Sequence, residues 1–288
     1  MSQRRSRRLE GAEGTGAASN ELAQRVASAI ALIAVSLLLT WAGLWTFAAL
    51  VLLCSMVVAW EWGRLVRGES FGPILFSHGA AIAVALILTT AGMPIFGLAV
   101  LAVGAVAVAL LARSETMPVW SVAGVIYLGL PAVCLVYLRS DVAYGWLAIL
   151  FVFLVVWFAD IGAYAVGRLI GGPRLAPKIS PNKTWSGAGA GLVASGAAAF
   201  GLGYWMGGTS PILLALVGIC LSAISQLGDL AESSVKRSFD VKDASQLIPG
   251  HGGMLDRIDA LLFASVAAGL LAAMRNPAYP GQALLIWP

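Results

Sequence analysis

Long apolar stretches recur along the chain from Val26 to Met274, and many approach the roughly 20 residues that cross a bilayer as a helix. Only 11% of the residues are charged, whereas about 25% is usual for a soluble domain. Inside hydrocarbon every backbone N–H and C=O must be paired within the chain, which favours helices. The alternating segments of about 10 residues that typify a membrane β-barrel are not seen. The sequence therefore predicts an all-α polytopic membrane protein.

Nine apolar segments have the length of a membrane-spanning helix. They are residues 25–41, 43–60, 74–92, 95–112, 118–138, 145–167, 185–206, 211–229 and 258–275. Lys and Arg gather in four of the connections between them, namely 61–73, 113–117, 168–184 and 230–257. Only Arg139 and Arg275 fall on the opposite side. Because basic residues stay on the cytosolic side, this asymmetry predicts nine spans with a cytosolic N-terminus.

Composition divides the chain into three regions. Residues 1–24 are polar and basic, which predicts a disordered cytosolic tail. Beside a membrane span such a tail is typical of a topology signal, so we expect no nucleic-acid partner. Residues 25–140 have almost nothing ionisable in mid-span and are interpreted as a scaffold. In residues 141–288 polar groups crowd the span ends, which predicts a catalytic region whose cytosolic loops are 168–184 and 230–257.

Three aspartates are expected to meet at one edge of the membrane. Asp256 and Asp259 are three residues apart at the start of the last span, so they share a helix face, and Asp229 closes the preceding span on the same side. Carboxylates brought together repel each other unless a cation lies among them. Oxygen ligands without His or Cys suit Mg²⁺, which commonly uses one or two carboxylates with phosphate oxygens and water.

The loop between these aspartates carries groups suited to phosphates. Its basic residues are Lys236, Arg237, Lys242 and Arg257. Gly252 and Gly253 let the backbone approach a ligand closely. His251 is interpreted as a loop-shaping or phosphate-binding group, because a phosphate nucleophile is already anionic and needs no general base. A divalent ion, several cations and a Gly-rich turn together indicate a nucleoside triphosphate site.

A second polar group of residues lies upstream. Asp160 stands near the end of an apolar span, where an ionised side chain is costly and marks a functional candidate. Tyr164 is four residues further on and shares its helix face. Lys178 and Lys183 flank a Ser-Pro turn at Ser180, a place suited either to binding a lipid phosphate or polyphosphate or to anchoring the topology.

Residues Ser233 to Asp259 resemble the signature of the phosphatidate cytidylyltransferase family, the CDP-diglyceride synthases. That signature reads S-x-[apolar]-K-R-x4-K-D-x-[small]-x2-[apolar]-P-x-H-G-G-[apolar]-x-D-R-[apolar]-D, and the chain meets every specified position. Residues Asp160 to Trp185 are similar to the family's D-x-G-A-Y-x2-G-R and L-x-P-x-I-S-P-x-K-T-W segments. The resemblance covers about residues 145–275, and upstream only looser features such as Glu61-Trp62 match. Ser186 departs from it, because the family often has Glu there.

The resemblance implies that CTP and phosphatidic acid react to give CDP-diacylglycerol and pyrophosphate, with Mg²⁺ as cofactor. It implies that Asp229 and Asp256 bind the metal. The implied catalytic set is Asp160, Asp229, Lys236, Asp256 and Asp259. The implied substrate-binding set is Lys178, Ser180, Lys183, Ser233, Arg237, Lys242, Asp243, His251, Gly252, Gly253 and Arg257.

We expect a multi-pass protein of the bacterial inner membrane whose active site faces the cytosol. Its expected partners are CTP, phosphatidic acid and the lipid bilayer. The lipid phosphate would attack the α-phosphorus of CTP in line, with catalysis by positioning and charge neutralisation. The oligomeric state stays open, with a homodimer as the candidate assembly.

A transporter would place ionisable groups at mid-membrane in several spans, or show an internal repeat, and neither is seen. A CDP-alcohol phosphotransferase would carry D-G-x2-A-R-x8-G-x3-D-x3-D, which is absent. A cytidylyltransferase acting on a different lipid phosphate stays open.

Overall fold

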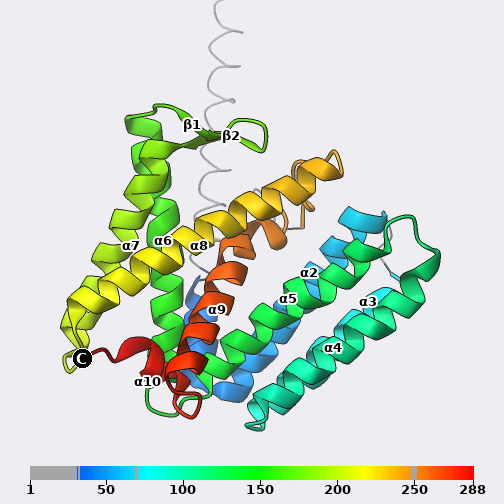
Figure 1. Ribbon diagram of the computed structural model, residues 1–288, viewed down its shortest axis with the longest axis horizontal. Coiled ribbons are helices and arrows are strands. Elements are labelled where there is room, and N and C mark those ends of the chain that lie inside the picture. The colour runs from blue at the N-terminus through cyan, green and yellow to red at the C-terminus, as the bar shows by residue number, and fades with distance from the viewer. Residues whose placement is uncertain (1–30, 32, 69–70, 248–251) are drawn as a thin grey trace, which may run out of the picture.

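The computed structural model describes residues 31, 33–68, 71–247 and 252–288, which form a helical protein with one small two-stranded sheet (Figure 1). The predicted tail, 1–24, lies outside the described residues. So does the start of the first predicted span, 25–41, of which the structure describes an apolar helix, Ile33–Ala42.

Seven helices in the described part of the chain are long and apolar enough to cross a membrane. They are α2 (Leu44–Arg67), α3 (Pro73–Thr90), α4 (Pro94–Leu111) with the 3₁₀ turn η1 (Ala112–Ser114), α5 (Pro118–Arg139), α6 (Gly145–Leu169), α8 (Pro211–Ser238) and α9 (Leu255–Arg275). The prediction of a helical, multi-pass membrane protein is therefore confirmed. The count of nine and the cytosolic N-terminus stay predictions.

Two further helices complete the fold. The seventh predicted span, 185–206, forms α7 (Trp185–Met206), which is rich in Gly and Ala and is not among the seven. A short helix, α10 (Pro280–Leu285), follows the last span. Local chemistry sets the starts of α7, α8 and α10. Proline occupies the first turn of α8 and α10, where its missing N–H costs nothing, and Thr184 caps α7 by accepting a hydrogen bond from the Gly187 N–H.

The predicted loop 230–257 is shorter than expected, because helices extend into it from both sides. α8 runs on to Ser238 instead of ending at Asp229, and α9 begins at Leu255 instead of 258. Hydropathy marks where a helix leaves the apolar layer, but backbone hydrogen bonding continues past that point. The ion pair between Glu232 and Lys236, one helical turn apart, supports the extension.

The predicted loop 168–184 holds an antiparallel hairpin. Its strands are β1 (Arg174–Ala176) and β2 (Ser180–Thr184). The hairpin sits beyond the end of α6 and leads directly into α7 (Figure 1). No hydrophobic alternation in this segment indicated strands, which is why the sequence predicted only a loop.

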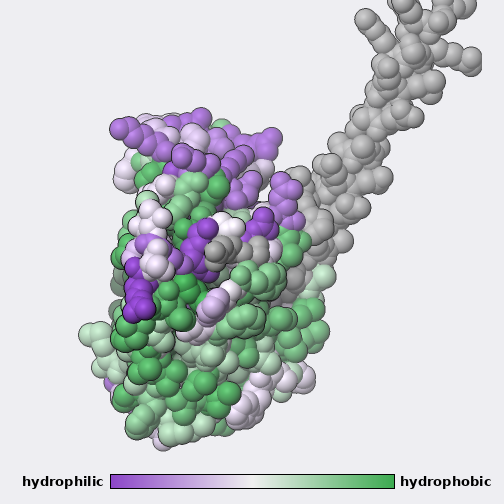
Figure 2. All heavy atoms as spheres, turned by 90° about the vertical axis from the view of Figure 1, so that its right-hand side faces the viewer, coloured by the Kyte–Doolittle hydropathy of each residue, from purple (hydrophilic) through white to green (hydrophobic). Residues whose placement is uncertain are grey.

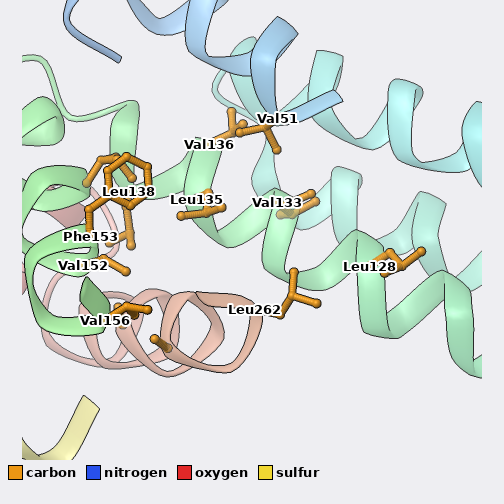
Figure 3. Close-up of a cluster of buried hydrophobic side chains, with 14 of the residues drawn as sticks. Val51, Leu128, Val133, Leu135, Val136, Leu138, Val152, Phe153, Val156 and Leu262 are labelled. Atoms are coloured by element: carbon orange, nitrogen blue, oxygen red, sulfur yellow. The ribbon is translucent and has the colours of Figure 1, made fainter. Parts of the chain in front are cut away.

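The apolar core lies where α5 meets α6, α9 and α2, and Figure 3 shows part of it. Val133 and Val136 of α5, Val152 of α6 and Leu262 of α9 are all buried there. Hydrophobic side chains also cover the lower part of the outer surface in Figure 2, whereas hydrophilic ones gather at the end that carries the hairpin. That division is typical of a membrane protein with one elaborated polar end.

α6 and α7 pack with their backbones close together. A Cβ at Gly191 would lie 2.8 Å from the Ala159 carbonyl oxygen, and one at Gly162 would lie 2.8 Å from the Ala194 Cβ. Small residues allow such close approach between membrane helices. The packing holds the end of α6, including Asp160, beside the start of α7 and the hairpin.

Candidate active site

The two polar segments singled out in the sequence meet at the hydrophilic end of the molecule. One comprises the end of α6 and the hairpin, and the other the end of α8 and the start of α9 (Figures 1 and 2). Residues far apart in the chain interact across this end, such as Lys183 with Asp229 and Asp160 with Arg257.

A cavity of about 670 Å³, here called the hairpin cavity, lies between α6, the hairpin, α7 and α8. Its lining includes Asp160, Tyr164, Arg168, Arg174, Lys183 and Asp229. Lys183 of β2 forms an ion pair with Asp229 of α8. Two carboxylates and three cations therefore share one open cavity, a composition that suits an anionic ligand accompanied by a metal ion.

The arginines of the hairpin cavity are held at its rim. Arg168 Nη1 donates to the Tyr164 hydroxyl at 2.7 Å, and Arg174 Nη1 donates to the Asn182 carbonyl oxygen at 3.2 Å. Both guanidinium groups keep further N–H donors, because arginine carries five. They extend the basic side of the cavity beyond the predicted Lys183.

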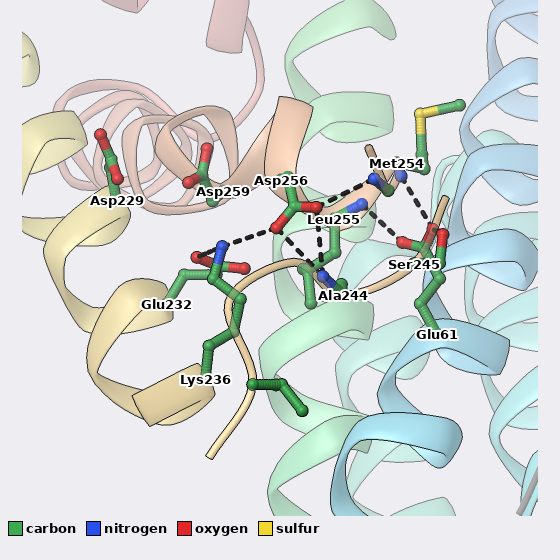
Figure 4. A network of polar contacts seen from close by, with 12 residues as sticks. Glu61, Asp229, Glu232, Lys236, Ala244, Ser245, Met254, Leu255, Asp256 and Asp259 are labelled. Atoms are coloured by element: carbon green, nitrogen blue, oxygen red, sulfur yellow. Dashed lines mark hydrogen bonds and ion pairs between the residues drawn. The ribbon is translucent and has the colours of Figure 1, made fainter. Parts of the chain in front are cut away.

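Beside this cavity lies the Lys236 cluster, made of Glu232, Lys236 and Asp256 (Figure 4). Lys236 Nζ lies 2.6 Å from Asp256 Oδ1 and 2.8 Å from Glu232 Oε2. The Asp256 carboxylate also accepts hydrogen bonds from the backbone N–H of Gly253 at 2.9 Å and of Ala244 at 3.2 Å. Asp256 thus links the end of α8, the segment before α9 and the first turn of α9.

More negative than positive charge gathers between α8 and α9. Asp259 is buried one turn beyond Asp256, and its carboxyl group interacts electrostatically with Asp229, Glu232 and Asp160. In Figure 4, Asp229 on α8 and Asp259 on α9 lie on neighbouring helices. The predicted convergence of carboxylates is present, and Glu232 adds a further one.

The carboxylate oxygens gathered here are of the kind that Mg²⁺ prefers as ligands. Glu232 Oε1 is buried and has no hydrogen-bond partner among the described residues, which leaves an anionic oxygen that a cation would satisfy. In the part of the chain that the structure describes, no group of three or more His, Cys, Asp or Glu is arranged to hold a metal by itself. Mg²⁺ often needs only one or two carboxylates, because phosphates and water complete its shell.

The two predicted metal ligands differ in how they are engaged. Asp229 forms an ion pair with Lys183 in an open cavity and has no other ion pair among the residues that the structure describes. Asp256 is bound by Lys236 and by two backbone amides. Asp229 is therefore the more available of the two, and ligation by either stays a prediction.

The remaining predicted residues surround these centres. Ser180 begins β2, exposed Lys178 lies in the hairpin turn, and Ser233 is half-buried on α8. Arg237 Nε donates to the Ile179 carbonyl oxygen at 3.3 Å and so ties α8 to the hairpin. Arg257 is exposed on the first turn of α9. His251 lies outside the described residues.

Lys242 and Asp243 line a second cavity, of about 750 Å³, together with Trp60 and Arg64 of α2. This loop cavity lies against residues 241–247 rather than against the hairpin. The structure therefore separates these two predicted substrate-binding residues from Asp160, Lys183 and Asp229.

Gly252 and Gly253, which were predicted to let the backbone approach a ligand, lie close to carboxylates of the protein itself. Gly252 has φ 80°, a left-handed conformation that favours glycine. A Cβ at Gly253 would lie 2.8 Å from Glu61 Oε1 and 3.0 Å from Asp256 Oδ2. The glycines let the chain pass between these two acids.

Sequence reasoning left Glu61, Glu232, Arg168 and Arg174 out of the predicted site. Glu61 and Glu232 are almost completely buried. The argument applied to Asp160, that an acid inside an apolar span is costly, would have identified both. Ser186, where the family often has Glu, bonds to the Thr184 hydroxyl at 3.0 Å and to the Gly171 carbonyl oxygen, so it fastens the end of the hairpin.

Comparison with known proteins shows that this chain is similar to cytidylyltransferases. The profile of the cytidylyltransferase family matches residues 23–274. A phosphatidate cytidylyltransferase of Brucella suis is 39% identical over 260 residues, covering 88% of this chain and 94% of the relative. Proteins of the same name from Staphylococcus haemolyticus and Haemophilus influenzae are each 46% identical, over 147 and 126 residues. These two alignments cover 48% and 42% of this chain, and 53% and 44% of the relatives.

Proposed function

The chain belongs to the cytidylyltransferase family, and on that premise we propose that it is a phosphatidate cytidylyltransferase. It transfers the cytidylyl group of CTP to phosphatidic acid, giving CDP-diacylglycerol and pyrophosphate. The observation that carries the proposal is the hairpin cavity, where Asp160 and Asp229 face Lys183, Arg168 and Arg174 at the polar end of a membrane protein. A lipid headgroup and a nucleotide can meet only at such an end.

In the proposed reaction an oxygen of the lipid phosphate attacks the α-phosphorus of CTP. The bond from the α-phosphorus to the oxygen that bridges it to the β-phosphate breaks, and pyrophosphate leaves. The attacking phosphate is already anionic, so the protein has no essential proton to remove. Its main tasks are to hold two anions together and to offset the charge that develops on the leaving group.

The cations of the cavity fit those tasks. Lys183, Arg168 and Arg174 would bind phosphate oxygens, the arginines through paired N–H donors. Lys236 would keep Asp256 and Glu232 in place behind them. Bound Mg²⁺ would neutralise charge on the pyrophosphate. Asp229 would hold the ion, with Asp256 as the second predicted ligand and Asp259 and Asp160 beside them.

Apolar side chains outside the cavity suit a lipid substrate. Ile161 and Leu169 on α6 and Trp185 at the start of α7 are all exposed. The acyl chains would lie along this surface while the headgroup enters the cavity. The bacterial relatives support the inner membrane as the location, and a cytosolic active site and a homodimer complete the proposal.

The direct test is pyrophosphate release by the purified protein in detergent, from CTP and Mg²⁺, with and without phosphatidic acid. Release is expected only when both substrates and the metal are present. Another nucleoside triphosphate in place of CTP and another lipid phosphate in place of phosphatidic acid serve as controls. Release with a different lipid phosphate but not with phosphatidic acid would change the assigned substrate. If folded protein releases no pyrophosphate with any lipid phosphate, the proposal is contradicted.

Asp229→Asn tests the metal assignment. The Mg²⁺ concentration that gives half-maximal rate should rise by about tenfold or more, because a neutral amide binds a hard cation poorly. A Mg²⁺ titration of the rate measures it. Asp240→Asn is the matched control, since Asp240 is exposed and has φ 55°, which asparagine tolerates. An unchanged Mg²⁺ requirement in Asp229→Asn would remove Asp229 from the metal site.

A further inference from the structure

Glu61 is an acid of the N-terminal helices that reaches the candidate site. It is the single acidic residue of α2, and its side chain is 0% exposed. A buried carboxylate persists only where hydrogen bonds or cations satisfy it. The hydrogen-bond donors of Glu61 therefore show which part of the molecule its carboxylate holds in place.

Within the described residues, the hydrogen bonds to the Glu61 carboxylate come from the C-terminal part of the chain (Figure 4). Oε1 accepts from the Ser245 hydroxyl at 2.5 Å and from the Met254 N–H at 2.9 Å. Oε2 accepts from the Leu255 N–H at 2.7 Å. One carboxylate therefore fastens both the segment after α8 and the start of α9.

Glu61 takes the place of a local helix cap. Met254, at the N-cap of α9, makes no capping hydrogen bond with its side chain. The first N–H groups of a helix lack partners within the helix, and an anion there also interacts favourably with the helix dipole. Glu61 supplies both effects from a separate helix, and so it sets where α9 begins.

The contacts of Glu61 adjoin those of Asp256 on both segments. Ser245 follows Ala244, whose N–H donates to Asp256, and Met254 follows Gly253, whose N–H does the same. A displacement of either segment would thus move the Asp256 carboxylate, and with it the first turn of α9, away from Lys236.

We propose that Glu61 is a positioning residue for cytidylyl transfer, holding the start of α9 and residues 244–245 so that Asp256 and Asp259 meet α8 correctly. The inference rests on the proposed function, and it gives the N-terminal helices a part in catalysis beyond that of a scaffold. Glu61 acts through Asp256 and Asp259 and touches no substrate.

Glu61→Gln tests the proposal with almost no change in volume. The glutamine amide has only one oxygen that can accept, and its NH₂ group would face a backbone N–H of α9. The three hydrogen bonds now made by Ser245, Met254 and Leu255 therefore cannot all remain. We expect kcat to fall by roughly 10- to 100-fold, as misplacement of catalytic groups produces. KM for CTP should change by less than about threefold, because the phosphate-binding cations stay in place.

Asp141→Asn is the matched control. Asp141 is also a buried carboxylate that fastens helix starts, accepting from the N–H groups of Ala143, Tyr144 and Gln282 at 3.0, 2.9 and 2.9 Å. It lies by α10, at the end of the molecule opposite the hairpin (Figure 1). This variant should lose thermal stability to a similar extent and keep its kcat per folded molecule. Equal losses of kcat in both variants would reduce Glu61 to a general structural role and overturn the proposal.

Hydrogen exchange provides a readout that needs no turnover. In Glu61→Gln, peptides covering residues 252–258 should exchange their amides faster than in the unchanged protein, whereas those of α6 should not. Ser245→Ala, which removes one donor and is the milder change, should lower kcat by a smaller factor. Unchanged exchange, or kcat within about twofold of the original in both variants, would contradict the proposal. The two proposals can fail separately. If the unchanged protein shows no cytidylyl transfer, the proposed function is refuted. Faster exchange in Glu61→Gln would still show that Glu61 caps α9.

Discussion

Replacing Asp256 with asparagine is expected to lower turnover by roughly 100- to 1000-fold, the range found when one preorganised electrostatic group is removed from an active site. The Asp256 carboxylate binds Lys236 Nζ and two backbone N–H groups at once, and asparagine can offer only one accepting oxygen. The protein should still fold, because Glu232 remains as a partner for the buried Lys236. Pyrophosphate release per molecule of folded protein measures the effect.

Glu115→Gln controls for the loss of an ion pair as such. Glu115 pairs with Arg67 at 3.6 Å and accepts from the Ser121 hydroxyl at 2.6 Å, and neither partner belongs to the Lys236 cluster. This variant should keep its turnover even if its melting temperature falls. A folded Asp256→Asn protein with normal turnover would remove Asp256 from the catalytic set and leave it a helix cap.

Lys236→Met should abolish turnover and also destabilise the protein. Lys236 is buried between Glu232 and Asp256, so its loss leaves the buried Glu232 and the half-buried Asp256 without their shared cation. Breaking a buried ion pair from one side typically costs about 3–5 kcal/mol. We expect a lower melting temperature in detergent and pyrophosphate release at background level.

The double variant Lys236→Met with Glu232→Gln separates the two effects. Removing the charge of Glu232 relieves part of the repulsion, so the melting temperature should recover in part. Turnover should not recover, because Asp256 still lacks its partner. Recovery of turnover together with stability would show that Lys236 contributes to folding alone.

The sequence predicted the membrane class and the polar end well, because both depend on local patterns. Apolar runs located α3 to α6 to within a few residues, since each run has the length of its span. The carboxylates Asp229, Asp256 and Asp259 were identified from their positions at span ends. The end of α8 was wrong because hydropathy falls at Asp229 although the helix continues to Ser238.

Long-range contacts account for what sequence reasoning could not supply. No local pattern shows that Lys183 pairs with Asp229 while Lys242 lies at a different cavity. Glu61 looked like a weak match in a scaffold, because its partners come almost two hundred residues later. The hairpin was missed because its strands are three and five residues long and carry no alternation.

The long sequence separation between Glu61 and its hydrogen-bond donors also bears on how the protein is synthesised. Leu255 is 194 residues further along the chain, so α2 enters the bilayer long before any donor for its carboxylate has been synthesised. During translation the Glu61 carboxyl group therefore needs water or another partner in place of these donors. A chain that stops before α9 keeps this unsatisfied acid within its apolar helices. The carboxylate of Glu61 is therefore satisfied only once the last span has been made and has packed against α2.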